Sequence, residues 1–188
     1  MTRKTLANSG LLCVALLLAG ASVALAEDDG KAAKKRAKID ARSDKVLEQV
    51  VGESPRAEEL FQKAIGYAVF DNTKAALGVS GGGGSGVAVD KASGARTYMK
   101  MGTAGVGFGI GVKKYQVVML FENEKVFRAF VEKGWQADTQ AGAAAGTKGA
   151  AAKTTFHNGI AVFVRTNKGL MASADVSGTK YWKSDLND

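Results

Sequence analysis

Residues with side chains suited to catalysis are few and scattered in this sequence. It contains one histidine, His157, and one cysteine, Cys13. A Ser-His-Asp site would have to use His157, but TTFHNGI is typical of the start of a strand, and no G-x-S-x-G nucleophile elbow occurs. The carboxylates lack the spacing of metal ligands, as the positions of Asp71, Asp90, Asp138 and Asp175 illustrate. The sequence therefore predicts a protein that is not an enzyme and that uses no metal or cofactor.

A glycine-rich stretch, ALGVSGGGGSGVAVD, contains the pattern G-x-G-x-x-G at Gly81, Gly83 and Gly86. In a dinucleotide site this pattern joins a strand to a helix, whose N-terminus holds the pyrophosphate. Here the following residues are typical of strand, turn and strand, and no acidic residue lies where the ribose partner should be. We therefore expect no nucleotide to bind.

The glycines are better explained by packing. In GVGFGIGV, glycines alternate with Val106, Phe108, Ile110 and Val112, so a strand would have one bare face. Such a face permits sharp coiling or close approach of a neighbour. Two such strands, GVSGGGGSG and GTAGVGFGIGV, predict a strongly curved antiparallel sheet with an element packed tightly against its bare face.

Basic side chains are concentrated near the N-terminus. The segment 31–42 has six basic residues and one acidic residue. On a helix, five of the basic residues lie in one stripe, namely Lys31, Lys34, Lys35, Lys38 and Arg42. This stripe predicts contact with an anionic surface, although a solvated tail would have the same composition. Lys113 and Lys114, at an expected junction between strands, form a second candidate site for phosphate.

The first 26 residues have the layout of a secretory signal peptide. Arg3 and Lys4 precede the apolar run LLCVALLLAG, and Ala24-Leu25-Ala26 is a typical cleavage site. An uncleaved membrane anchor is the alternative, but the run is short for a bilayer span. Cleavage would leave a cysteine-free chain of charge +6, against +8 for the whole sequence. We expect a periplasmic protein, either free or peripheral on a membrane, for which phospholipid is a more plausible anionic partner than nucleic acid.

The remaining chain is interpreted as an α+β domain. Two N-terminal helices are expected, the first capped by Ser43, the second beginning at Ser54-Pro55 and ending at Gly66. A curved, barrel-like, glycine-rich antiparallel sheet follows, with one intervening helix over NEKVFRAFVEKG that is capped by Asn123 and a closing hairpin that turns at TNKG. Residues 141–153 fit either a strand or a loop. The predicted division is a signal peptide at 1–26, a basic segment at 27–42 and a domain at 43–188.

The order of these motifs resembles the SYLF lipid-binding domain family over residues 43–178. SPRAEELFQKAIGYAVFDNTKAALGVSGGGGSGVAV is similar to the family's opening, where a helix with a Pro-x-Ala turn leads into a glycine-rich strand. GTAGVGFGIGVKKYQVVMLFENEKVFRAFV resembles the next block, and WQADTQAGAAAG and NKGLMASADVSG resemble the closing ones. The resemblance implies binding to phospholipids, phosphoinositides especially, through a basic N-terminal part. Eukaryotic members act at membranes and in some cases on actin, and bacterial members are exported.

The sequence thus favours an exported, non-enzymatic protein that binds anionic phospholipid. Two alternatives stay open. One is a structural or interaction protein of the cell envelope, with the basic segment as a tail. The other is a small outer-membrane β-barrel, which the two helices and the polar terminus SDLND disfavour.

Overall fold

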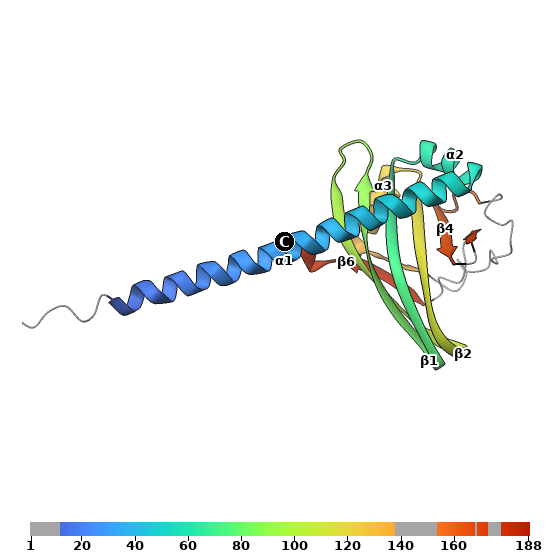
Figure 1. Cartoon of the computed structure of the whole chain (residues 1–188). Coiled ribbons are helices and arrows are strands. Elements are labelled where there is room, and N and C mark those ends of the chain that lie inside the picture. The colour runs from blue at the N-terminus through green and yellow to red at the C-terminus, as the bar shows by residue number, and fades with distance from the viewer. Residues whose placement is uncertain (1–11, 138–153, 168, 173–177) are drawn as a thin grey trace, which may run out of the picture. The chain divides into compact units, whose positions relative to one another are not determined.

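The computed structural model describes residues 12–137, 154–167, 169–172 and 178–188, without the side chains of 12–28, 77–79, 106–110, 137 and 171–172. The described elements are, in order, α1 (Leu12–Glu53), α2 (Pro55–Lys63), β1 (Gly66–Asp90), β2 (Arg96–Phe121), α3 (Glu124–Lys133), β3 (Trp135–Ala137), β4 (Ile160–Thr166), β5 (Gly169–Ala172), β6 (Thr179–Lys183) and the short 3-10 helix η3 (Asp185–Asn187). The expected α+β fold is confirmed (Figure 1). The chain divides into two compact units, Met1–Ala37 and Lys38–Asp188. Residues 141–153, for which the sequence left strand and loop open, lie outside the described part.

The two shorter helices begin where their capping residues predict. The side chain of Ser54 accepts a hydrogen bond from the backbone N–H of Ala57 (3.2 Å), and Pro55 opens α2. Asn123 caps α3 in the same way, accepting from the N–H of Val126 (3.1 Å). The predicted end of α2 at Gly66 is wrong, because the helix ends at Lys63 and Gly66 already belongs to β1.

The expected helix start at Ser43 is also wrong. α1 runs without a break through Ser43, whose side chain is buried on the packed face of the helix. An N-cap needs a residue outside the helical conformation, whereas the Ala-, Lys- and Arg-rich segment before Ser43 favours helix throughout. Among the helices described, none has the length and apolar character needed to cross a membrane.

The sheet is built around one long strand, β2. Its strand order is β3-β6-β2-β4-β5, and β1 pairs with β2 as well (Figure 1). All pairings are antiparallel, and the sheet is not closed. β1 and β2 pair from Gly66↔Phe121 to Val89↔Arg96, with a register shift between Leu77 and Val79. The predicted turn at TNKG is confirmed, since it joins β4 to β5 with Thr166 opposite Gly169.

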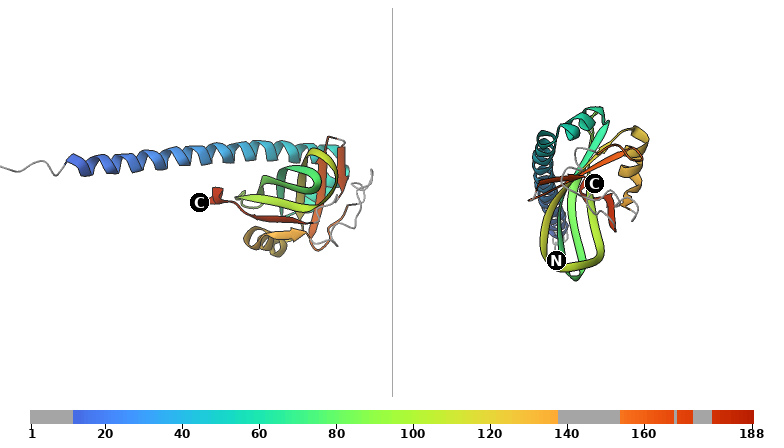
Figure 2. Two further views of the ribbon diagram at one scale, coloured as in Figure 1. Left: turned by 90° about the horizontal axis from the view of Figure 1, so that it is seen from below. Right: turned by 90° about the vertical axis from the view of Figure 1, so that its right-hand side faces the viewer.

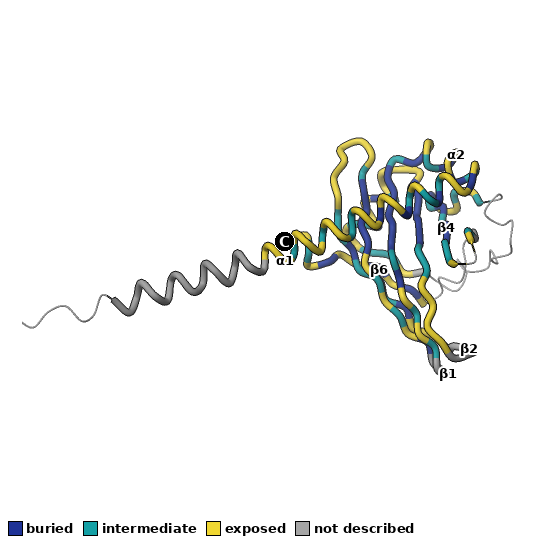
Figure 3. The backbone as a smooth tube through the Cα atoms, in the orientation of Figure 1, coloured by how far each residue is buried: buried dark blue, intermediate teal, exposed yellow. Residues whose placement is uncertain are grey.

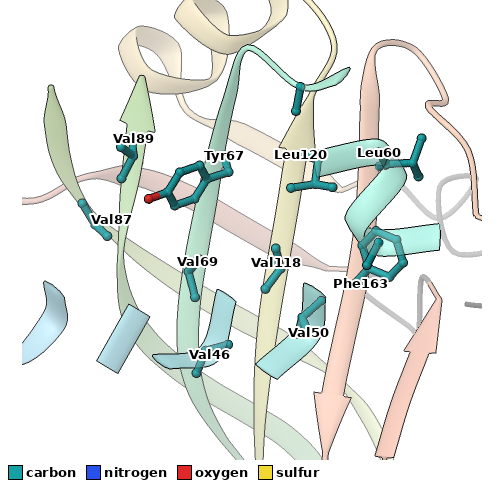
Figure 4. Packing of buried hydrophobic residues seen from close by; sticks show 13 residues of the cluster. Val46, Val50, Leu60, Tyr67, Val69, Val87, Val89, Val118, Leu120 and Phe163 are labelled. Carbon is teal, nitrogen blue, oxygen red and sulfur yellow. The ribbon is translucent and has the colours of Figure 1, made fainter. Parts of the chain in front are cut away.

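Alternating side chains of the strands supply two hydrophobic clusters. Val69 and Val118 belong to the first, together with Val46, Val50 and Leu60 from α1 and α2 (Figure 4). The neighbouring strand residues belong to the second cluster, which also contains the α3 rings and consists of Ala68, Phe70, Ala88, Met99, Met101, Val117, Met119, Phe121, Phe127, Phe130, Val164 and Tyr181. The period of two along the strands therefore separates a layer with α1 and α2 from a layer with α3.

Candidate functional site

The predicted basic stripe lies on α1. The helix runs unbroken through residues 31–42, which confirms the helical spacing on which the stripe depends. Lys34 and Lys35, in the first unit, have exposed side chains, as has Lys38 at the start of the second (Figure 3). Lys31 is exposed as well. Whether these side chains bind lipid stays a prediction.

Arg42 differs from the lysines of the stripe. Its guanidinium group forms an ion pair with the carboxylate of Asp71 in β1. The amide of Gln116 donates to the other oxygen of that carboxylate (3.3 Å). Because Asp71 is 29 residues away along the chain, nothing in the sequence near Arg42 indicated this partner. Arg42 therefore connects α1 to the sheet as well as adding to the basic surface.

Further polar contacts fix the segment of α1 from Lys38 to Glu53 on the sheet. Arg96 of β2 donates to Asp40 (2.9 Å) and to Asp44 (3.0 Å). The hydroxyl of Tyr98 donates to the second oxygen of Asp40 (2.9 Å). At the end of the helix, Arg165 of β4 pairs with Glu53 (3.0 Å). These contacts orient the helix over the first hydrophobic cluster and leave Lys38 exposed.

The second candidate pair, Lys113 and Lys114, lies within β2. Sequence analysis placed these residues at a junction between strands, and this is wrong because β2 is continuous from Arg96 to Phe121. Both lysines are exposed. The register places Lys113 directly opposite Lys74 of β1, a partner that the sequence analysis missed. Lys74, Lys113 and Lys114 come together only because the two long strands β1 and β2 pair with each other.

The glycine fingerprint does not form a phosphate site. β1 continues beyond Gly86 as strand to Asp90, and a turn leads into β2, so no helix N-terminus follows. A β-carbon at Gly84 would overlap the carbonyl of Asp71 and the side-chain amide of Asn72, and one at Gly82 would lie 2.5 Å from the carbonyl oxygen of Thr73. One at Gly86 would overlap the carbonyl of Val69 and the ring of Phe70. The expected close approach to a bare glycine face is therefore confirmed for β1, which folds back against its own first half.

The glycines of β2 have a different environment. Nothing lies within 4 Å of a β-carbon built on Gly111, and the nearest atom to one on Gly105 is the Ser80 hydroxyl at 3.5 Å. The expected tight packing is thus absent at these two positions. The alternating side chains of residues 106–110 lie outside the described part.

His157 is exposed and lies in a tight turn. Its backbone N–H and carbonyl pair with Ile160 (2.9 and 3.0 Å), while Asn158 (φ 51°) and Gly159 (φ 78°) form the turn. This is the two-residue turn for which Asn-Gly is favoured, a signal present in the sequence and missed. Within the described ranges, no group of three His, Cys, Asp or Glu side chains could hold a metal ion. Asp138 and Asp175 lie outside those ranges.

Comparison with known proteins identifies part of this architecture. A family model described as "Ysc84: Las17-binding protein actin regulator" matches residues 102–187, from the middle of β2 to η3. Residues 102–187 are therefore similar to the Ysc84, or SYLF, family. This confirms the predicted family resemblance. The matched range contains Lys113 and Lys114, and it begins well after the basic stripe on α1.

A curated relative extends the similarity toward the N-terminus. Beta cell expansion factor A of Aeromonas veronii is 44% identical to this chain over 153 residues. The alignment covers 81% of this chain and 59% of that protein. The chain therefore spans about three fifths of the length of this curated relative, which is itself a bacterial SYLF-type protein.

Proposed function

We propose that this protein is exported and binds membranes containing anionic phospholipid, without catalysis. The Ysc84 family is one of non-enzymatic binding domains, with lipid-binding and actin-regulator members. The observation that carries the proposal for this chain is the exposure of three lysines of the basic segment, Lys34, Lys35 and Lys38. Lysine side chains near an anionic bilayer each contribute about 1 kcal/mol of binding free energy.

The depth of this contact follows from the composition of the helix. Ala32, Ala33, Ala37 and Ala41 supply little apolar surface between the basic residues. The helix segment therefore adds electrostatic attraction with little hydrophobic anchoring. Binding through this segment is expected to fall steeply as salt rises, because salt screens charges at a surface.

Vesicle flotation tests the proposal directly. The mature chain, which begins at Glu27 after the proposed cleavage, should float with vesicles of phosphatidylcholine mixed with phosphatidylglycerol and should not float with phosphatidylcholine alone. Vesicles that contain phosphoinositides with different numbers of headgroup phosphates show whether binding depends on that number. A chain that binds neither kind of vesicle at low salt would contradict the proposal.

A charge-reversal triple variant tests the residues. Changing Lys34, Lys35 and Lys38 to Glu should abolish flotation at moderate salt, because three attractive contacts become repulsive. The matched control changes Lys125, Lys133 and Lys180 to Glu, three exposed lysines outside α1, with the same change in net charge. Equal loss in both variants would mean that only net charge matters and not the α1 surface.

Export is tested separately by sequencing the N-terminus of the protein recovered from a bacterial periplasmic fraction. Cleavage after Ala26 predicts that the mature protein begins at Glu27. An intact N-terminus in the cytoplasmic fraction would contradict the proposed export and leave the lipid-binding proposal unaffected.

A protein partner is a second candidate, favoured by the description of the matched family as Las17-binding. Under this reading the Ysc84 domain recognises a polypeptide, and the charge of α1 keeps the protein near the envelope. If the protein floats with envelope fractions but not with protein-free vesicles, this second candidate is favoured over direct lipid binding.

A further inference from the structure

The middle of the β1–β2 hairpin is covered by no other described strand. β4 pairs only with Tyr115–Phe121 of β2, and β6 only with Met99–Thr103. Among the described strands, residues 105–114 of β2 therefore pair with β1 alone. This part, residues 73–80 of β1 with 105–114 of β2, is termed the hairpin bend. It projects beyond the rest of the sheet in Figure 1 and in the right-hand view of Figure 2.

The hairpin bend is apolar in sequence. Between Lys74 and Lys113 the two strands contribute AALGVS and GVGFGIGV. Of the large apolar side chains that are described, Val112 is the most exposed, at 69%. Transfer of such an apolar side chain out of water is favourable. Neither 72–89 nor 96–121 contains an aspartate or glutamate.

Lysines flank this apolar part on both strands. Lys74 faces Lys113 across the register, and Lys114 faces Thr73. Like charges directly opposite each other in a sheet destabilise the pairing. The strands retain this unfavourable arrangement with no acidic residue in either stretch to offset it. An anionic partner near both lysines would attract each of them and offset their mutual repulsion.

The backbone of the hairpin bend limits how deeply it can enter a membrane. A chain in hydrocarbon must satisfy its own N–H and carbonyl groups. β1 and β2 pair with each other across most of this region, but the backbone groups on the outer edges of the two strands pair with no other described strand and therefore need the water and headgroups of the interface. Lys74 is about four residues from the register shift, or ~13 Å at ~3.3 Å per residue. That length reaches past the headgroups but cannot cross a hydrocarbon core of about 30 Å.

We propose that the hairpin bend inserts into the interface of an anionic phospholipid membrane. Its apolar end enters the boundary between headgroups and acyl chains, and Lys74, Lys113 and Lys114 contact lipid phosphates. The inference rests on the proposed function and adds to it a second, hydrophobic point of attachment. It explains why the strands carry glycine and apolar residues where no other described strand pairs with them.

A fluorescent probe at position 112 measures the insertion. The full chain is prepared with Cys13→Ser and Val112→Cys and labelled with nitrobenzoxadiazole. On vesicles of phosphatidylcholine mixed with phosphatidylglycerol, its emission should shift to the blue and be quenched by nitroxide-labelled acyl chains. The matched control carries the probe at Ala92→Cys, an exposed position in the turn at the other end of the hairpin, and should show neither effect.

Two sets of variants test the residues. Lys113→Glu with Lys114→Glu should weaken vesicle binding by at least about tenfold, since each lysine near the surface contributes about a factor of five. Lys125→Glu with Lys133→Glu on α3 is the control of equal charge and should have a much smaller effect. Val112→Asp should weaken binding as well, and thermal unfolding should be unchanged because Val112 is exposed.

The outcomes separate the two proposals. Wild-type binding with a water-like, unquenched probe at position 112 would overturn the insertion and leave membrane binding in place. Equal losses in the Lys113/Lys114 and Lys125/Lys133 variants would also overturn it. A wild-type chain that binds no anionic vesicle would overturn both proposals.

Discussion

Two glycine-rich segments of the same hairpin have opposite surroundings. In β1, β-carbons at Gly82, Gly84 and Gly86 would collide with the backbone or side chains of residues 69–74. In β2, Gly105 and Gly111 have open space or ordinary contact where a β-carbon would stand. The first segment folds against protein, whereas the second lies in or beside a part of the sheet that other described strands do not cover.

This difference shows that composition alone does not give the reason for a glycine. Glycine in a strand has an entropic cost relative to other residues, so each run needs a compensating benefit. For β1 the benefit is a close approach of two strand halves, which lets one strand of 25 residues fold back on itself. In β2, packing accounts for Gly102, where a β-carbon would lie 3.1 Å from the Trp182 ring, but not for Gly105 and Gly111, for which the proposed membrane contact supplies another reason.

The largest expected effect is on the packed segment. Gly84→Ala places a methyl group onto Asp71 and Asn72, so the free energy of unfolding should fall by roughly 3 kcal/mol. The same change at Gly81, where nothing lies within 4 Å, should alter it by less than about 1 kcal/mol, on the stabilising side. Urea unfolding of both variants makes the measurement. Similar values for the two would contradict the packing of β1 on itself.

A smaller effect is expected at Gly111. There is space for a side chain, but its φ of 149° is a conformation that L-residues rarely adopt. Gly111→Ala should therefore cost about 1–2 kcal/mol through backbone strain alone. Gly105→Ala is the control, because its nearest contact is at 3.5 Å and its φ is not positive. A Gly111 variant as stable as the Gly105 variant would show that the backbone relaxes at the hairpin bend.

The smallest effect concerns the turn at the other end of the hairpin. The backbone N–H and hydroxyl of Ser93, with the N–H of Ala92, lower the pKa of Asp90 below its ordinary value. A lowered folded-state pKa means that the stabilisation is present above the unfolded value of about 3.9 and is lost as pH falls through the folded value.

Asp90→Asn should therefore lower stability at pH 7, and the difference from wild type should shrink below about pH 4. The hairpin bend, whose sequence contains no acidic residue, should add nothing to this pH dependence. Thermal unfolding across a pH series makes the comparison. A difference that persists unchanged to pH 2 would mean that the carboxylate charge is not what fixes the turn.

The sequence predicted the local features of the fold best. Ser54 and Asn123 as caps, and TNKG as a turn, depend on neighbouring residues only, and the structure confirms each. The register that brings Lys74 opposite Lys113 depends on pairing between distant segments, and so does the Arg42–Asp71 ion pair. These juxtapositions could not be derived from spacing along the chain.

Ser43 illustrates a different kind of error. Its side chain is a good N-cap, but a cap forms only where the preceding residues leave the helix. Here the preceding segment favours helix, and Ser43 lies on the buried face of α1. The exposed lysines of α1 were predicted correctly as a helical stripe, because that prediction required only local helix.

Hydrogen exchange of the full chain, with and without anionic vesicles, tests most directly the claim that one glycine segment packs on protein and the other meets a membrane. The amides of residues 82–86 should exchange slowly in both conditions. Those of residues 73–76 and 111–114 should exchange faster in solution and become protected when vesicles are added, because their ribbon is uncovered by other described strands. No added protection at 73–76 and 111–114 on vesicles that do bind the chain, or fast exchange at 82–86, would contradict the account.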